Sequence, residues 1–126
     1  MPTTADFLIE RLINQGVKHA FGVPGDYILP FYKKMNDSKD IEIINVTDEN
    51  SAGFAADGYS RINGIGCACV TYNVGASKLI NAVQCAYAER SPLVVISGSP
   101  GVAERKENVL LHHTVRSFEH QKEMFD

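Results

Sequence analysis

The stretch GCACVTYNVGASKLINAVQCAYAERSPLVVIS, residues 66–97, decides the fold class of this chain. It opens with a nearly continuous apolar run at 66–72, continues with apolar residues at helical spacing over 76–89, and ends with a second apolar run at 93–97. Strands that are apolar throughout, rather than alternating with polar residues, are typical of a parallel sheet covered on both faces. The stretch therefore predicts a strand–helix–strand unit of an α/β fold.

The rest of the chain shows the same alternation. A first helix is capped by Thr3 or Thr4 and ended by Gly16, and it carries apolar residues at helical spacing: Ala5, Leu8, Ile9, Leu12 and Ile13. Further strands are predicted at 17–23 and 41–47, and further helices at 27–35 and 50–62. After Gly101 we expect a polar loop, the run VLLHHTV and a charged amphipathic tail. We predict one domain, residues 1–126, with an open, mostly parallel sheet of at least four strands and helices on both faces.

Composition excludes several classes of function. The net charge of -3, without a Lys/Arg block, argues against a surface for nucleic acid or anionic membrane. No apolar run reaches the roughly 18 residues of a membrane span, and the N-terminus has no signal-peptide pattern, so we expect a cytoplasmic protein. The cysteines, Cys67, Cys69 and Cys85, lack metal-site spacing and are expected to be buried, reduced thiols.

Polar or glycine-rich segments follow each of the four predicted strands, at 24–26, 48–50, 73–75 and 98–101. In open parallel sheets, ligands bind beyond the carboxyl ends of the strands, near the point where strand order reverses. We therefore expect these segments to converge on one edge of the domain. The Gly-x-Gly at 64–66 precedes a strand and no lysine of the Walker type follows a glycine loop, so neither phosphate-binding motif is present.

Glu49 is the first candidate for chemistry. It lies between a predicted strand end and an alanine-rich helix, with Asp48 beside it. One interpretation is structural: Asp48 caps the helix and Glu49 favours its positive N-terminal end. The other is functional: a carboxyl group in a mostly apolar surround has a raised pKa and can share a proton.

Asp26 and the pair His112-His113 are further candidates. Asp26 has a structural interpretation as the N-cap of a helix starting at Tyr27, within an ordinary turn composition. Adjacent histidines in a strand would point to opposite faces, so joint metal chelation is not expected. Proton transfer by one or both imidazoles and a plain surface-loop role both fit the residues.

Taken together, the segments FGVPGDY, TDENSAGFAADGYSR, VTYNVGASKLINAVQCAYAERSPLVVISGSPG and VLLHHT resemble the N-terminal pyrimidine-binding domain of thiamine-diphosphate enzymes. The similarity spans nearly the whole chain in the order of the family. Adjacent histidines after a Val-Leu run are the mark of the branch of pyruvate, indolepyruvate and phenylpyruvate decarboxylases. Acetolactate synthases share the domain but lack this pair.

The resemblance implies roles for the candidates. A glutamate at the position of Glu49 hydrogen-bonds N1′ of the aminopyrimidine and so helps to remove the C2 proton of the thiazolium, which then serves as electron sink. The resemblance also places further residues: Thr71 and Val74 against the pyrimidine, Pro24 and Gly25 lining the pocket, and Asp26, His112 and His113 as proton-handling groups for a small 2-keto acid substrate.

The resemblance also implies a partner. Family members bind the diphosphate through Mg²⁺ on a second domain with a Gly-Asp-Gly segment, which these 126 residues lack. We expect that domain in the same or another subunit of a homo-oligomer, and a continuation of the present domain after residue 126, without which a sheet edge would be exposed. A fragment, a separate subunit and a truncated product are all compatible, the fragment best. Two alternative functions stay open: an acetolactate-synthase-like carboligase part and a non-catalytic partner-binding subunit.

Overall fold

The computed structural model describes residues 1–105 and 109–126, so 106–108, within the predicted polar loop, lie outside the described residues. The described part contains one sheet of four parallel strands in the order β2–β1–β3–β4. The bounds are β1 (His19–Gly22), β2 (Glu42–Asn45), β3 (Gly66–Val70) and β4 (Leu93–Ser97). The chain runs outward from β1 to β2 and then returns to the other side of β1, so the strand order reverses between β1 and β3. Ligands in such folds bind at this reversal.

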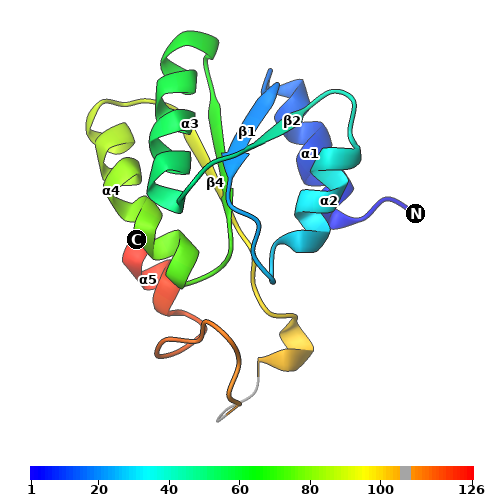
Figure 1. Cartoon of the computed structure of the whole chain (residues 1–126), viewed down its shortest axis with the longest axis vertical. Helices are drawn as coiled ribbons and strands as arrows, with labels where there is room; N and C mark the ends of the chain where they lie inside the picture. Colours follow the sequence, from blue (N-terminus) through cyan, green and yellow to red (C-terminus); the bar gives the residue numbers. More distant parts are fainter. Residues whose placement is uncertain (106–108) are drawn as a thin grey trace.

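Helices cover both faces of the sheet. Helices α1 (Thr4–Asn14) and α2 (Leu29–Asp37) lie on one face, and α3 (Glu49–Asn63) and α4 (Val74–Ala88) lie on the other (Figure 1). A short 3₁₀ turn, η1 (Val102–Glu104), and a last helix, α5 (His120–Phe125), follow β4. The predicted α/β fold with helices on both faces is confirmed. None of the helices in the described ranges is long and apolar enough to cross a membrane.

The core has two halves, one on each face of β3. All five residues of this strand are buried. Because successive side chains of a strand point to opposite faces, Cys67 and Cys69 join the core under α1 and α2, whereas Ala68 and Val70 join the core under α3 and α4. This two-sided burial explains why the strand is apolar throughout.

Two of the three cysteines behave as predicted. Cys67 and Cys69 are buried and free, and burial raises the pKa of Cys67 to about 12 and that of Cys69 still further. Cys85, on α4, is only partly buried. The expectation of a buried thiol is therefore wrong for Cys85.

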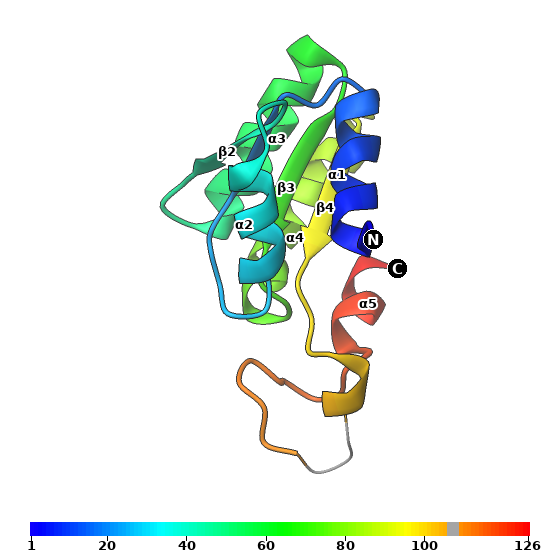
Figure 2. The same cartoon turned by 90° about the vertical axis from the view of Figure 1, so that its right-hand side faces the viewer.

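The main departures from the predicted elements lie at the ends of strands and helices. The first three strands are shorter than predicted, and α2 begins at Leu29 rather than at Tyr27. The cause of the late start is a turn in which the Ile28 N–H donates to the carbonyl oxygen of Gly25 over 3.0 Å. Figure 2 shows that the segment after β4 extends beyond the carboxyl end of the sheet before the chain returns in α5.

Candidate active site

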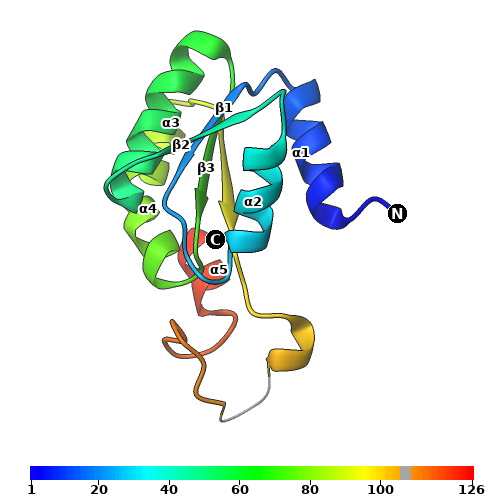
Figure 3. The same ribbon diagram turned by 45° about the vertical axis from the view of Figure 1, so that its right-hand side comes forward.

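Segments that follow three different strands meet beside the strand reversal. The loop after β1 and the start of α4 after β3 lie at the same end of the sheet (Figure 3). A Cβ atom added to Gly25 would lie 2.7 Å from the Cβ of Thr71. One added to Gly75 would lie 3.1 Å from the Cγ2 of Thr71 and 3.4 Å from Glu49 Oε1. The structure thus brings Gly25, Glu49, Thr71 and Gly75 together.

Glu49 is the first residue of α3, but it does not cap the helix. Asp48 does, because its Oδ1 accepts a hydrogen bond of 2.8 Å from the Ser51 N–H, and that bond lowers the pKa of Asp48. The Glu49 side chain is 17% exposed and its Oε2 lies 3.4 Å from Nζ of Lys78. The expected mostly apolar surround is therefore wrong in one respect, because a lysine of α4 stands beside the carboxylate. With the cap supplied by Asp48, Glu49 is available to a ligand.

Thr71 presents a buried hydroxyl at the end of β3. Its Oγ1 has no hydrogen-bond partner among the described residues. A buried polar atom without a partner costs about 1–3 kcal/mol, and a ligand that supplies the missing hydrogen bond recovers that cost. Val74, the first residue of α4, is 45% exposed, and Pro24 is exposed on the loop after β1. Both residues are neighbours in sequence of the glycines that contact Thr71, Gly75 and Gly25.

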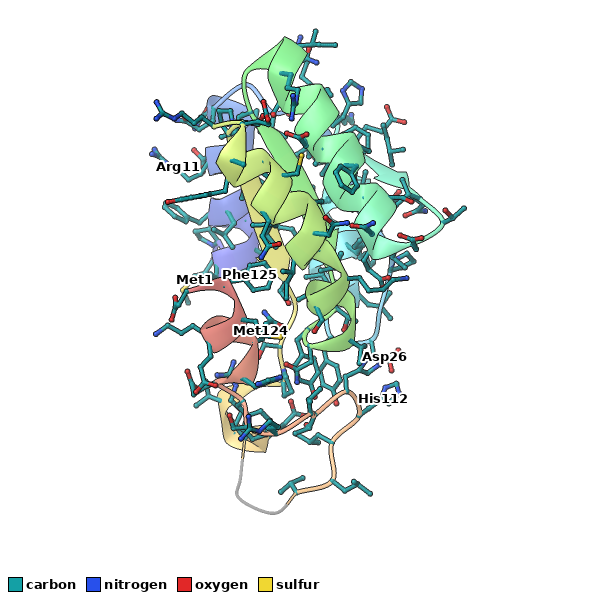
Figure 4. All side chains as sticks on the ribbon, turned by 90° about the vertical axis from the view of Figure 1, so that its left-hand side faces the viewer. Met1, Arg11, Asp26, His112, Met124 and Phe125 are labelled. Atoms are coloured by element: carbon teal, nitrogen blue, oxygen red, sulfur yellow. The ribbon has the colours of Figure 1, made fainter. Side chains whose placement is uncertain are left out.

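The second group of candidates forms a cluster of its own. Oδ2 of Asp26 lies 3.1 Å from Nδ1 of His112, across 86 positions of sequence. Figure 4 shows the two side chains together at the end of the molecule beyond the sheet. Asp26 is therefore not the N-cap of α2; Ile28 takes that position, without a side-chain hydrogen bond. The capping interpretation of Asp26 is wrong.

The two histidines do not point to opposite faces. Their ring centroids are 3.7 Å apart, with the ring planes at 73°. The prediction assumed a strand, but the segment is a turn, and His113 has a φ of 66°. This left-handed conformation brings both rings to one side of the chain. Asp26, His112 and His113 consequently lie close enough to act together.

Tyr72 and Asn73 hold the histidine turn; sequence reasoning included Asn73 in the polar segment 73–75 but missed this role, and it missed Tyr72. The Tyr72 hydroxyl donates to the carbonyl oxygen of His112, and its Oη lies 3.0 Å from Oγ1 of Thr114. The Asn73 side-chain amide donates to the carbonyl oxygen of His113 over 2.8 Å. Asn73 itself has a φ of 51°, which asparagine tolerates better than most residues. A polar pair directly after a buried strand was the available signal.

Comparisons with known proteins place this architecture in a family. The model of the family "Thiamine pyrophosphate enzyme, N-terminal TPP binding domain" matches residues 2–124. An indole-3-pyruvate decarboxylase of Azospirillum brasilense is 42% identical over 122 residues, which cover 96% of this chain and 22% of the relative. A pyruvate decarboxylase of Neurospora crassa is 44% identical over 113 residues, covering 90% of this chain and 20% of the relative. Pyruvate decarboxylase 1 of Arabidopsis thaliana is 39% identical over 113 residues, which cover 90% of this chain and 19% of the relative.

The chain spans about a fifth of the length of these curated relatives. The family match covers nearly all of its residues, including every candidate at the strand ends. This chain belongs to the thiamine pyrophosphate enzymes, as their N-terminal TPP-binding domain.

Proposed function

We propose that this chain is the pyrimidine-binding part of a thiamine-diphosphate-dependent 2-keto acid decarboxylase, a lyase that releases carbon dioxide and an aldehyde. The observation that carries the proposal is the position of Glu49. Its carboxylate is 17% exposed and lies beside Gly75, which also contacts Thr71, whose buried hydroxyl has no partner among the described residues. The relatives named as pyruvate and indole-3-pyruvate decarboxylases support the reaction class.

The residues at this position fit an aminopyrimidine. Gly75 has no side chain where a Cβ would lie 3.4 Å from Glu49 Oε1, which leaves the carboxylate open to a flat ring. The Thr71 hydroxyl is buried and without a partner in the described part of the chain, so a polar ring atom can satisfy it. The side chain of Val74, 45% exposed, would offer apolar surface to the ring, and Pro24 and Gly25 would line the pocket beside Thr71.

Glu49 would handle the proton at N1′ of the pyrimidine. When bound, thiamine diphosphate supplies the electron sink for the release of carbon dioxide. The contact with Nζ of Lys78, 3.4 Å, is made by Oε2, whereas Oε1 lies beside Gly75, so Oε1 can hydrogen-bond the ring while Lys78 stays in place. Lys78 is 52% exposed, so this ion pair is worth only about 0–1 kcal/mol and does not oppose cofactor binding strongly.

Asp26, His112 and His113 would handle protons of the substrate and product. Imidazoles are common general acids and bases, and the Asp26 carboxylate, 3.1 Å from Nδ1 of His112, orients that ring. Tyr72 and Asn73 act as positioning residues, because they bind the backbone of the histidine turn and not the rings.

Further parts of the proposal concern partners and location. Mg²⁺ would be held by a diphosphate-binding domain in the same or another subunit, since these 126 residues carry no Gly-Asp-Gly segment. The edge strand β4 is only partly buried along its length, unlike β3, which supports additional structure packing there. A small 2-keto acid as substrate, a homo-oligomeric assembly and a cytoplasmic location complete the proposal; the two buried reduced thiols support the last.

The test is product analysis with the complete enzyme that contains this chain. We expect aldehyde and carbon dioxide from a 2-keto acid, strictly dependent on thiamine diphosphate and Mg²⁺. An acetohydroxy acid as the main product, or turnover without the cofactor, would overturn the proposal.

A further inference from the structure

The cluster of Asp26, His112 and His113 has the geometry of an ion site. Each residue offers one ligand atom, and the three atoms all lie within 4.8 Å of one another. Three ligands on one tetrahedral Zn²⁺, at about 2.0–2.1 Å from the ion, are roughly 3.4 Å apart. The distance between Asp26 Oδ2 and His112 Nδ1 is 3.1 Å, about 0.3 Å shorter than this separation. Because no pair of these atoms is more than 4.8 Å apart, side-chain movements that shorten the remaining distances by at most about 1.4 Å would bring the third ligand into place.

A second observation points to a missing ligand. Nδ1 of His113 is buried and has no hydrogen-bond partner within the described residues. The backbone that carries the ring is held in place, because the carbonyl oxygen of His113 accepts a hydrogen bond from the Asn73 amide and the residue has a φ of 66°. An imidazole on a fixed backbone with an unsatisfied nitrogen is a preorganised donor for a bound group.

The donor set selects the kind of ion. Two imidazoles and one carboxylate suit Zn²⁺ and its neighbours Co²⁺, Ni²⁺ and Cu²⁺, whereas Mg²⁺ and Ca²⁺ prefer oxygen ligands alone. The side chains of Asp26 and His112 are 69% and 67% exposed, so an ion can enter from solvent and keep water on its open positions. Such a site would be distinct from one that holds Mg²⁺ on a diphosphate.

We propose that Asp26, His112 and His113 bind a divalent transition-metal ion of the Zn²⁺ type, and that the bound ion inhibits the enzyme. The proposed ion binding is argued from the geometry of the three residues and does not depend on the proposed function. The inhibition rests on the proposed function, because an ion on these three residues would occupy the groups that otherwise move protons.

Binding is tested on the 126-residue chain with Co²⁺ as a spectroscopic probe. To exclude the partly buried thiol, all proteins carry Cys85→Ser. We expect visible Co²⁺ absorption bands that Zn²⁺ abolishes and that millimolar Mg²⁺ leaves unchanged. Asp26→Asn, His112→Gln and His113→Gln should each weaken Co²⁺ binding by at least about 10-fold, whereas His120→Gln, the matched control on α5, should not.

Because Asp26 and His112 are exposed, their variants should keep the circular dichroism of the folded chain, so loss of binding reports the site. No absorption bands, or bands equally strong in His112→Gln and Asp26→Asn, would overturn the ion site. Inhibition is tested on the complete enzyme: Zn²⁺ should inhibit the parent and His120→Gln equally, and a chelator should reverse it. Ion binding without inhibition would refute the inhibitory role and leave the site standing.

Discussion

Gly25→Ala offers a sharp steric test of the convergence at the strand reversal. The added Cβ would lie 2.7 Å from the Cβ of Thr71, whereas carbon atoms in ordinary contact are about 3.5–4.0 Å apart. About 1 Å of movement must therefore be absorbed by Thr71 or by the loop after β1. Forced overpacking of this kind costs about 1–3 kcal/mol of unfolding free energy. A displacement of about 1 Å at a positioning group costs on the order of 100-fold in catalysis.

Gly58→Ala is the matched control, because the same atom added there, on the exposed side of α3, meets nothing within 4 Å. It should stabilise the helix by about 0.5–1 kcal/mol. Stability is measured by urea unfolding of the 126-residue chain, and kcat/KM for 2-keto acid decarboxylation in the complete enzyme. Unchanged kcat/KM in Gly25→Ala, together with a clear loss of stability, would refute the claim that Thr71 and its neighbours line the cofactor site.

Three further predictions concern stability, thiol chemistry and the missing half of the site. Nη2 of Arg61 lies 2.8 Å from the buried Asp57 carboxylate and lowers the pKa of that carboxyl below 3.8. The ion pair therefore stabilises the folded chain fully above pH 3.8, and this stabilisation is lost as the pH falls through the lowered pKa. Asp57→Asn should therefore lower the free energy of unfolding, measured in urea at neutral pH, by about 1–3 kcal/mol. An equal loss at pH 2 would contradict this linkage. In the folded chain a disulfide reagent should modify Cys85 first, and Cys67 and Cys69 only on unfolding; three equally fast thiols would contradict their burial. The isolated chain should release no aldehyde with thiamine diphosphate and Mg²⁺, and measurable release would show that 126 residues suffice.

The order and type of the elements were predictable because the apolar pattern carries them. Both faces of β3 are buried, and this two-sided burial produces the continuous apolar run from which the parallel sheet was predicted. The strand ends were less accurate, because a strand ends where its hydrogen-bonding neighbour ends. The last pair of β3 with β4 is Val70 with Ser97, so Thr71 and Tyr72 fall outside the strand despite their apolar neighbours.

Glu49, Gly75 and Thr71 lie together, as the general rule for parallel sheets predicts, but the rule does not predict that Lys78 contacts Glu49. Its contact with Glu49 depends on how α4 packs beside α3, which the sequence around either residue does not state. The sequence did not predict the histidine turn, because its geometry depends on the positive φ of His113 and on hydrogen bonds from Tyr72 and Asn73, about 40 residues earlier. No pattern of neighbouring residues predicts such long-range bonds.

The central claim is that Glu49 moves the proton that activates the cofactor. Its most direct test is hydrogen–deuterium exchange at C2 of thiamine diphosphate bound to the complete enzyme, followed by quenched-flow NMR. Glu49→Gln should slow this exchange by at least about 100-fold, since general acid–base catalysis contributes about 10²–10⁴-fold. Glu89→Gln, an exposed glutamate at the far end of α4, should leave it unchanged. C2 exchange as fast in Glu49→Gln as in the parent enzyme would contradict the account.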